Sequence, residues 1–130
     1  MTVVPQRPIA VIGDTQSTLR VERYFLRREQ NPRERELLLQ HLLGTEFEVL
    51  VHLGDMVENG SSAAAWREFD RLFAPFFAKN IRFFPLLGNH DYWGNKQRRC
   101  AHLQTRFPSC LNSPWQALTI GRAGVRLGLV

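Results

Sequence analysis

Three short apolar segments of this chain each end in a glycine, which is followed by a side chain with a metal-ligating oxygen. The pairs are Gly13-Asp14, Gly54-Asp55 and Gly88-Asn89. In a parallel α/β sheet such turns lie together at the carboxyl ends of the strands, where these folds place their sites. Glycine permits tight turns there and lets the backbone approach a ligand. The repeated pattern therefore predicts one site with two carboxylates and an amide oxygen.

Further polar residues flank these pairs. Gln16 follows the first aspartate by two positions, and His90-Asp91 follows Asn89 directly. Carboxylate and amide oxygens suit Mg²⁺ or Mn²⁺, and added nitrogen ligands suit Fe or Zn. Two such metals can share a carboxylate and clamp a phosphoryl group. A histidine beside them can protonate the leaving oxygen, and we expect the neighbouring Asp91 to orient the imidazole of His90.

The three blocks resemble those of the calcineurin-like metallophosphoesterases. That family carries Asp-x-His, then Gly-Asp, then Gly-Asn-His-Asp/Glu. The matching segments here are Gly-Asp-Thr-Gln (13–16), Gly-Asp-Met-Val-Glu-Asn-Gly (54–60) and Gly-Asn-His-Asp-Tyr-Trp-Gly (88–94). The likeness covers residues 8–94 strongly and residues 115–130 only loosely.

The resemblance implies a role for each matching residue. Asp14 binds the first of two divalent metals, Asp55 bridges both, and Asn89 binds the second through its amide oxygen. His90 stabilises the phosphoryl transition state or acts as a general acid, and Asp91 orients it. The implied activity is hydrolysis of phosphate mono- or diesters at a centre of two Mn, Mg, Fe or Zn ions, with a phosphate ester as substrate.

The sequence departs from the family pattern in two places. Gln16 stands where the family has a metal-binding histidine, which should loosen the first metal or favour Mn²⁺, Mg²⁺ or Ca²⁺. The chain also ends before a lone His and a Gly-His-x-His block. The resemblance thus implies that residues 1–130 form a single partial domain, the N-terminal half of a four-layer α/β/β/α sandwich. The alternative function is an inert metal- or partner-binding fragment, whose apolar strand 125–130 invites self-association.

Hydrophobic periodicity predicts an α/β order of elements. The predicted strands span residues 8–12, 47–53 and 81–87, and the predicted helices span 32–43 and 63–79 with a kink or break at Pro75. This alternation predicts a parallel sheet with crossover helices. Residues 95–114 are predicted to be irregular, and residues 115–120 and 125–130 to form a hairpin.

The first predicted helix has start and stop signals and an apolar stripe. Asn31 is expected to cap it, with Pro32 at the first helical position and Glu34 reaching back to the cap. Gly44 is placed to end it. The predicted stripe consists of Leu37, Leu38, Leu42 and Leu43.

Composition excludes several classes of protein. With 44% hydrophobic and 22% charged residues, the 130-residue chain is neither a disordered tail nor a membrane protein. Two cysteines are too few for a disulfide framework, which together with the absence of a signal peptide predicts a cytoplasmic protein. The net charge is +5. Glutamates interleave the arginines of residues 20–35, so a solvated helix face is favoured over a nucleic-acid-binding module, and nucleic acid is expected only as a possible substrate.

The remaining histidines and two aromatic residues have competing interpretations. His52 lies in an apolar strand and is predicted to be a core residue rather than a ligand. His41 is predicted at the surface or in packing, and His102 is the one remaining histidine with a chance of reaching the site. Tyr92 and Trp93 either pack or wall a substrate cleft, and packing is favoured.

Overall fold

A parallel sheet forms the centre of the computed structural model, which describes residues 7–25, 31–113, 116–120 and 125–129. Its strands are β1 (Ile9–Ile12), β2 (Val49–His52) and β3 (Arg82–Pro85), in that spatial order. The register sets Ile12 opposite His52, and His52 opposite Pro85, so the three strands end at one edge. The N–H groups of Arg82 and Leu86 donate to the carbonyls of Glu48 and His52. Pro85, which has no N–H, therefore lies at a position of β3 that is not required to donate to β2. The predicted parallel sheet is confirmed.

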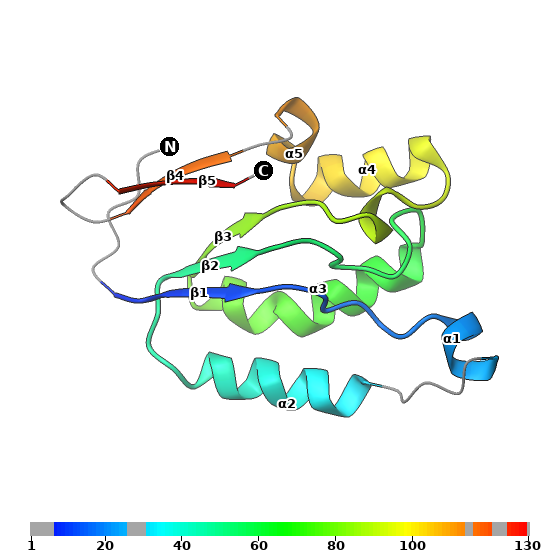
Figure 1. Cartoon of the computed structure of the whole chain (residues 1–130), viewed down its shortest axis with the longest axis horizontal. Helices are drawn as coiled ribbons and strands as arrows, with labels where there is room; N and C mark the ends of the chain where they lie inside the picture. The colour runs from blue at the N-terminus through cyan, green and yellow to red at the C-terminus, as the bar shows by residue number, and fades with distance from the viewer. Residues whose placement is uncertain (1–6, 26–30, 114–115, 121–124, 130) are drawn as a thin grey trace.

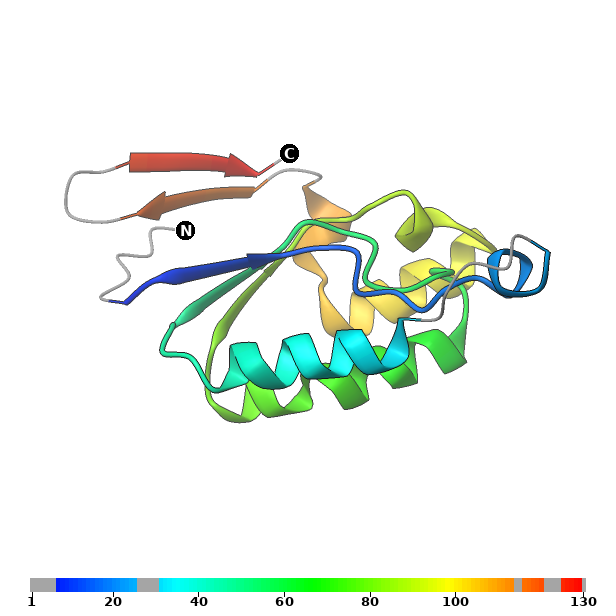
Figure 2. The ribbon, with the colours of Figure 1, turned by 60° about the horizontal axis from the view of Figure 1, so that its bottom comes forward.

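Two long helices cover one face of this sheet, and a hairpin lies on its other side (Figures 1 and 2). The helices are α2 (Pro32–Leu43) and α3 (Ala63–Ala78), and the hairpin consists of β4 (Gln116–Ile120) and β5 (Val125–Leu129). The shorter elements are α1 (Arg20–Tyr24), the 3₁₀ helix η1 (His90–Tyr92), α4 (Lys96–Arg106) and α5 (Ser109–Asn112). The crossover helices and the hairpin are as predicted, and the four-layer sandwich stays a prediction.

The main core lies between the sheet and α3. Ser62 begins this helix, because its side chain accepts the N–H of Ala65. The aromatic residues that recur at helical spacing on α3 are expected to pack in the core; Trp66, Phe69, Phe73 and Phe76 are buried there, whereas Phe77 is 40% exposed. The helix continues through Pro75 for one more turn, so the predicted break does not occur there. On the opposite face of the sheet, a second cluster consists of Val49, Val51, Phe84 and Leu86.

The inward face of α2 differs from the predicted stripe. Leu42 and Leu43 pack against the main core as predicted. Leu37 and Leu38 are more than half exposed, whereas Leu39 and Arg35 are buried. Arg35 lies four residues before Leu39 and therefore shares its face. A charged residue at that position hides the true stripe from a hydrophobicity pattern, so the predicted solvated role of Arg35 is wrong.

Residues 95–114 are predicted to be irregular, but 96–106 and 109–112 form α4 and α5. The side chain of Asn95 accepts the N–H of Arg98 and begins α4. Leu103 and Phe107 bury against the main core. This helix has few apolar residues, so its periodicity is too weak to reveal it.

None of the described helices is both long and apolar enough to cross a bilayer. Cys100 and Cys110 are both free thiols, as predicted.

Candidate active site

The segments that follow β1 and β2 run side by side past the ends of the strands. We call residues 13–18 the β1 turn and residues 53–60 the β2 turn. The N–H of Asp14 donates to the carbonyl of Gly54 at 3.1 Å, and the N–H of Gln16 donates to that of Asp55 at 3.1 Å. These bonds fix both candidate ligands of the β1 turn beside Asp55.

Both aspartates hold an unusual backbone conformation. The φ angle is 52° at Asp14 and 53° at Asp55, in the left-handed region that residues other than glycine rarely adopt. Such strain persists only where the surroundings impose it, and it concentrates at functional sites. Its occurrence at both aspartates marks this edge of the sheet as the candidate site.

The segment after β3, residues 86–94, joins the other two through Asp55, and we call it the β3 turn. The N–H of His90 donates to Oδ1 of Asp55 at 2.8 Å. A Cβ on Gly88 would lie 2.2 Å from the same oxygen, so only glycine fits against this carboxylate. The fold therefore brings Asn89 and His90 to the turns that carry Asp14 and Asp55.

Asp91 ties the β2 and β3 turns together from inside the protein. Its buried carboxylate accepts the N–H groups of Met56 at 3.0 Å, Val57 at 3.2 Å and Gly88 at 2.9 Å. Burial raises its pKa to about 6, and the nearby Asp55 carboxylate adds to that effect while the three N–H groups oppose it. The carboxylate is thus engaged by backbone donors of both turns.

The imidazole of His90 is oriented by other groups than the one we predicted. Its Nδ1 lies 3.1 Å from the carbonyl oxygen of Glu58, and its ring lies 4.0 Å from the Trp93 ring between centroids. A carbonyl only accepts, so Nδ1 carries a hydrogen and Nε2 is left for a substrate. We expected Asp91 to contact this ring, but the carbonyl of Glu58 and the ring of Trp93 do so instead. The Asp91 carboxylate accepts backbone N–H groups.

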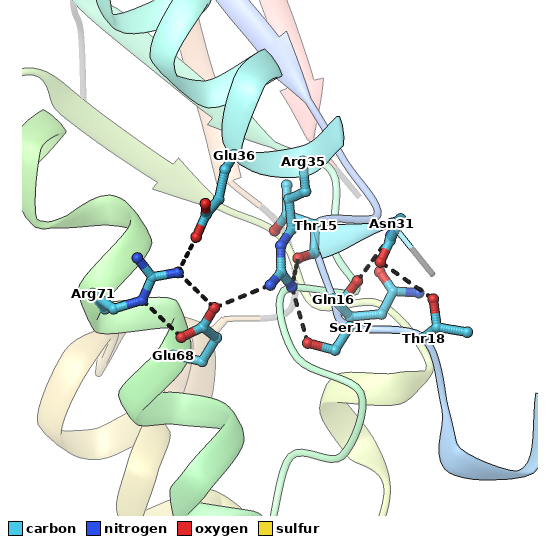
Figure 3. Close-up of polar contacts among 9 residues, drawn as sticks. All are labelled: Thr15, Gln16, Ser17, Thr18, Asn31, Arg35, Glu36, Glu68 and Arg71. Atoms are coloured by element: carbon cyan, nitrogen blue, oxygen red, sulfur yellow. Dashed lines mark hydrogen bonds and ion pairs between the residues drawn. The ribbon is translucent and has the colours of Figure 1, made fainter. Parts of the chain in front are cut away.

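Thr15 is held from two sides, and this fixes the β1 turn between its two candidate ligands. Its carbonyl accepts from Nη1 of the buried Arg35 at 3.0 Å, and its hydroxyl lies 2.8 Å from Nε2 of His52. The same Nη1 donates to Ser17 Oγ at 3.0 Å. Figure 3 shows the Arg35 guanidinium, which comes from α2, between this turn and Glu68.

The guanidinium of Arg35 belongs to a wider ion-pair network. Its Nη2 lies 3.1 Å from a carboxylate oxygen of Glu68 on α3. Arg71 binds both Glu68 and Glu36, as Figure 3 shows, and its hydrogen bond to Glu68 lowers the pKa of that carboxyl. The network therefore links α2, α3 and the β1 turn.

His52 connects the β1 and β2 turns as a neutral core residue. Its Nδ1 accepts the N–H of Gly54 at 3.1 Å, so Nε2 carries the hydrogen and donates to Thr15. Its ring packs against Phe73 and Phe83, and burial lowers its pKa to about 4. The predicted core position is confirmed, whereas the bridging role was not predicted.

Asn31 serves the β1 turn and does not cap α2 with its side chain, contrary to our prediction. Its Oδ1 accepts from the Thr18 hydroxyl at 3.2 Å, and its Nδ2 donates to the Gln16 carbonyl at 3.4 Å. The Asn31 side chain therefore bonds to the β1 turn and is not available to cap α2. Pro32 begins the helix as predicted.

The other candidates lie apart from these bonds. His41 is exposed on α2. His102 lies on α4 beside Trp66 and Arg106, where partial burial lowers its pKa. The Asn59 side chain accepts the N–H and O–H of Ser61, and so shapes the end of the β2 turn.

A family comparison now bears on this arrangement of turns. The model for calcineurin-like phosphoesterases matches residues 7–123. The chain belongs to the calcineurin-like phosphoesterase family. The match spans all three turns and continues through α4 and α5 into the hairpin. No curated protein matches the chain.

Divalent metals serve this family, and the residues present fit a hard cation. Oε1 of Gln16 is buried and has no hydrogen-bond partner in the described part of the chain. An unmatched buried acceptor costs about 1–3 kcal/mol, a cost that a bound cation would remove. Two carboxylates and two amide oxygens are the ligands that Mg²⁺, Mn²⁺ or Ca²⁺ prefer. Among the described residues, no group of three or more His, Cys, Asp or Glu side chains is placed to hold a metal ion. Two of the four candidate donors, Gln16 and Asn89, are amides and so fall outside these four residue types.

Proposed function

We propose that this chain is a metal-dependent phosphoesterase that hydrolyses phosphate mono- or diesters. The observation that carries the proposal is the bond from the His90 N–H to the Asp55 carboxylate, because it sets the candidate acid beside a candidate metal ligand. Family membership supports the same reaction class.

In this proposal Asp14, Gln16, Asp55 and Asn89 hold two divalent ions. Bound ions would polarise the phosphoryl oxygens and lower the pKa of a water molecule. The amide oxygen of Gln16, in place of a family histidine, favours Mn²⁺, Mg²⁺ or Ca²⁺ over Zn or Fe. The orphaned Oε1 of Gln16 supports its place in this set.

His90 is the proposed general acid. Its Nδ1 hydrogen is held by the Glu58 carbonyl, so a second proton on Nε2 is the one available for transfer. As a water oxygen bonds to phosphorus, the ester P–O bond breaks and the leaving oxygen takes the Nε2 proton. The water releases one proton to solvent, and the imidazole regains its own from solvent.

Hydrolysis of p-nitrophenyl phosphate with Mn²⁺ tests the proposal. We expect turnover that Asp55→Asn abolishes. On phenyl phosphate, whose leaving oxygen needs the proton far more than p-nitrophenolate does, His90→Ala should lower turnover by about 10²–10⁴-fold, the usual contribution of a general acid. His41→Ala, an exposed histidine on α2, is the matched control and should leave turnover unchanged. Turnover that survives both Asp55→Asn and His90→Ala would overturn the proposal.

A second candidate is an inert metal- or partner-binding module. The donor set favours it, because only two of the four proposed ligands carry a charge. It predicts Mn²⁺ binding that depends on Asp14 and Asp55 without any turnover. A cytoplasmic location belongs to both candidates and agrees with the two free thiols.

A further inference from the structure

Two large aromatic side chains beside His90 are open to solvent. Trp93 is 42% exposed and Tyr92 is 45% exposed. One part of the Trp93 ring lies against the His90 imidazole. Burial of aromatic rings is strongly stabilising, so two adjacent exposed rings at a candidate site indicate binding more than packing.

The next helix, α4, brings only positive charge to this turn. Its residues Lys96–Arg106 include four cations and no acid. The guanidinium carbon of Arg99 lies 5.7 Å from the centroid of the Tyr92 ring, and its Nη1 donates to the Tyr92 carbonyl. Arg106 is paired with Asp70, whereas Lys96 and Arg98 are exposed. Aromatic rings interleaved with cations are the pattern that binds bases and phosphates together.

The position of these groups relative to His90 indicates which part of a substrate they would meet. The Glu58 carbonyl holds Nδ1 of His90, so Nε2 faces the leaving oxygen in the proposed reaction. A leaving group on that oxygen lies beside the imidazole and near Trp93, whose ring centroid is 4.0 Å from that of the imidazole, with the two planes tilted by 34°. Trp93 therefore lies on the leaving-group side of the site.

We propose that the β3 turn and α4 bind a phosphoester whose leaving group carries a nucleobase. The base stacks on Trp93, while Arg99, which lies over the Tyr92 ring, and the exposed cations of α4 attract the phosphate of the ligand. The inference rests on the proposed function for the place of the leaving group. A free nucleotide and a single-stranded nucleic acid share this chemistry.

Binding of adenosine 5′-monophosphate and of ribose 5-phosphate to the full chain tests the proposal without added metal. NMR titration follows the tryptophan indole N–H signals, with Trp93 assigned from the Trp93→Leu variant. We expect the nucleotide to bind about ten-fold more tightly than the sugar phosphate, which is the size of one stacked base. A ten-residue oligothymidylate separates the sources: tighter binding than the mononucleotide indicates a strand, and weaker binding indicates a free nucleotide.

Matched variants sharpen the titration. Trp93→Leu should remove the preference and Trp93→Phe should keep it, while Phe77→Leu, at a ring 40% exposed on α3, should have no effect. Arg99→Gln should weaken both ligands, and Arg67→Gln on exposed α3 surface should weaken neither. Circular dichroism of each variant verifies the fold.

Equal affinities for the two ligands, or a preference that survives Trp93→Leu in a folded variant, would overturn the inference. The outcome is separable from that of the proposed function. A chain that hydrolyses p-nitrophenyl phosphate without base preference contradicts only this inference. A chain that prefers the nucleotide but shows no metal-dependent turnover contradicts only the proposed function.

Discussion

The β1 turn and the paired β2 and β3 turns are held in place by different means. Long side chains from distant elements hold the β1 turn, chiefly Arg35 from α2 and His52 from β2. The β2 and β3 turns are packed backbone against backbone. A Cβ on Gly60 would lie 1.8 Å from the carbonyl oxygen of Asp91, whose carboxylate binds three N–H groups of both turns.

The difference separates what a short sequence block can encode from what it cannot. Close backbone packing requires glycine at fixed spacing, so Gly54, Gly60 and Gly88 stand out within their blocks. The β1 turn instead depends on residues 20 and 37 positions away from Thr15. The two regions should therefore fail in different ways when their supports are removed.

The largest expected effect is that of Gly60→Ala. The added methyl group meets the backbone of Asp91, which cannot move without breaking the bond from Gly60 N–H to His90 O. We expect a loss of about 3 kcal/mol or more in the free energy of unfolding, measured by urea denaturation. Gly44→Ala is the control, since this glycine has an ordinary φ of −78° and should lose little. Equal losses in the two variants would contradict close packing of the turns.

Arg35→Met, which removes a support of the β1 turn, should lower the free energy of unfolding by nearly as much. It leaves the Thr15 carbonyl and the Ser17 hydroxyl without their donor, and it removes a buried partner of Glu68. We expect a loss of about 3 kcal/mol in the free energy of unfolding. Arg71→Met removes an exposed arginine from the same glutamate and should cost less than about 1 kcal/mol. Similar losses from both variants would show that Arg35 does not hold the turn.

Because burial lowers the pKa of His52, we expect the stability of the fold to depend on pH. Its pKa is about 4 in the folded chain and 6.5 when unfolded, so stability is full above pH 6.5. As the pH falls from 6.5 towards 4, only the unfolded chain takes up the proton, and stability falls by up to about 1.4 kcal/mol per unit. Asp91, with its raised pKa, acts in the opposite direction over part of this range. The contribution of His52 is therefore measured by comparing the pH dependence of the natural chain with that of a His52 variant.

Urea denaturation at pH 7 and pH 5 isolates that contribution. His52→Gln should lessen the fall in stability between the two values by about 2 kcal/mol. His41→Gln, at an exposed position, should leave the fall as it is in the natural chain. An unchanged fall in His52→Gln would mean that this ring is not buried and neutral.

Sequence reasoning located the sheet and the three turns because each strand ends at a glycine followed by an oxygen donor. It missed the support that Arg35 gives to the β1 turn, since in the sequence Arg35 is only one of several arginines in the same segment. It misassigned Asp91 because sequence adjacency to His90 suggested a contact, whereas the carboxylate turns inward to backbone N–H groups. It missed α4, whose burial rests mainly on Leu103 and Phe107.

Mn²⁺ binding followed by electron paramagnetic resonance tests most directly whether the three turns form one metal centre. We predict that the chain binds Mn²⁺, that Asp55→Asn and Asp14→Asn each weaken binding at least ten-fold, and that Asp70→Asn, a surface aspartate on α3, does not. Binding that is absent from the folded chain, or that is equally strong in all three variants, would contradict a metal centre at this edge of the sheet.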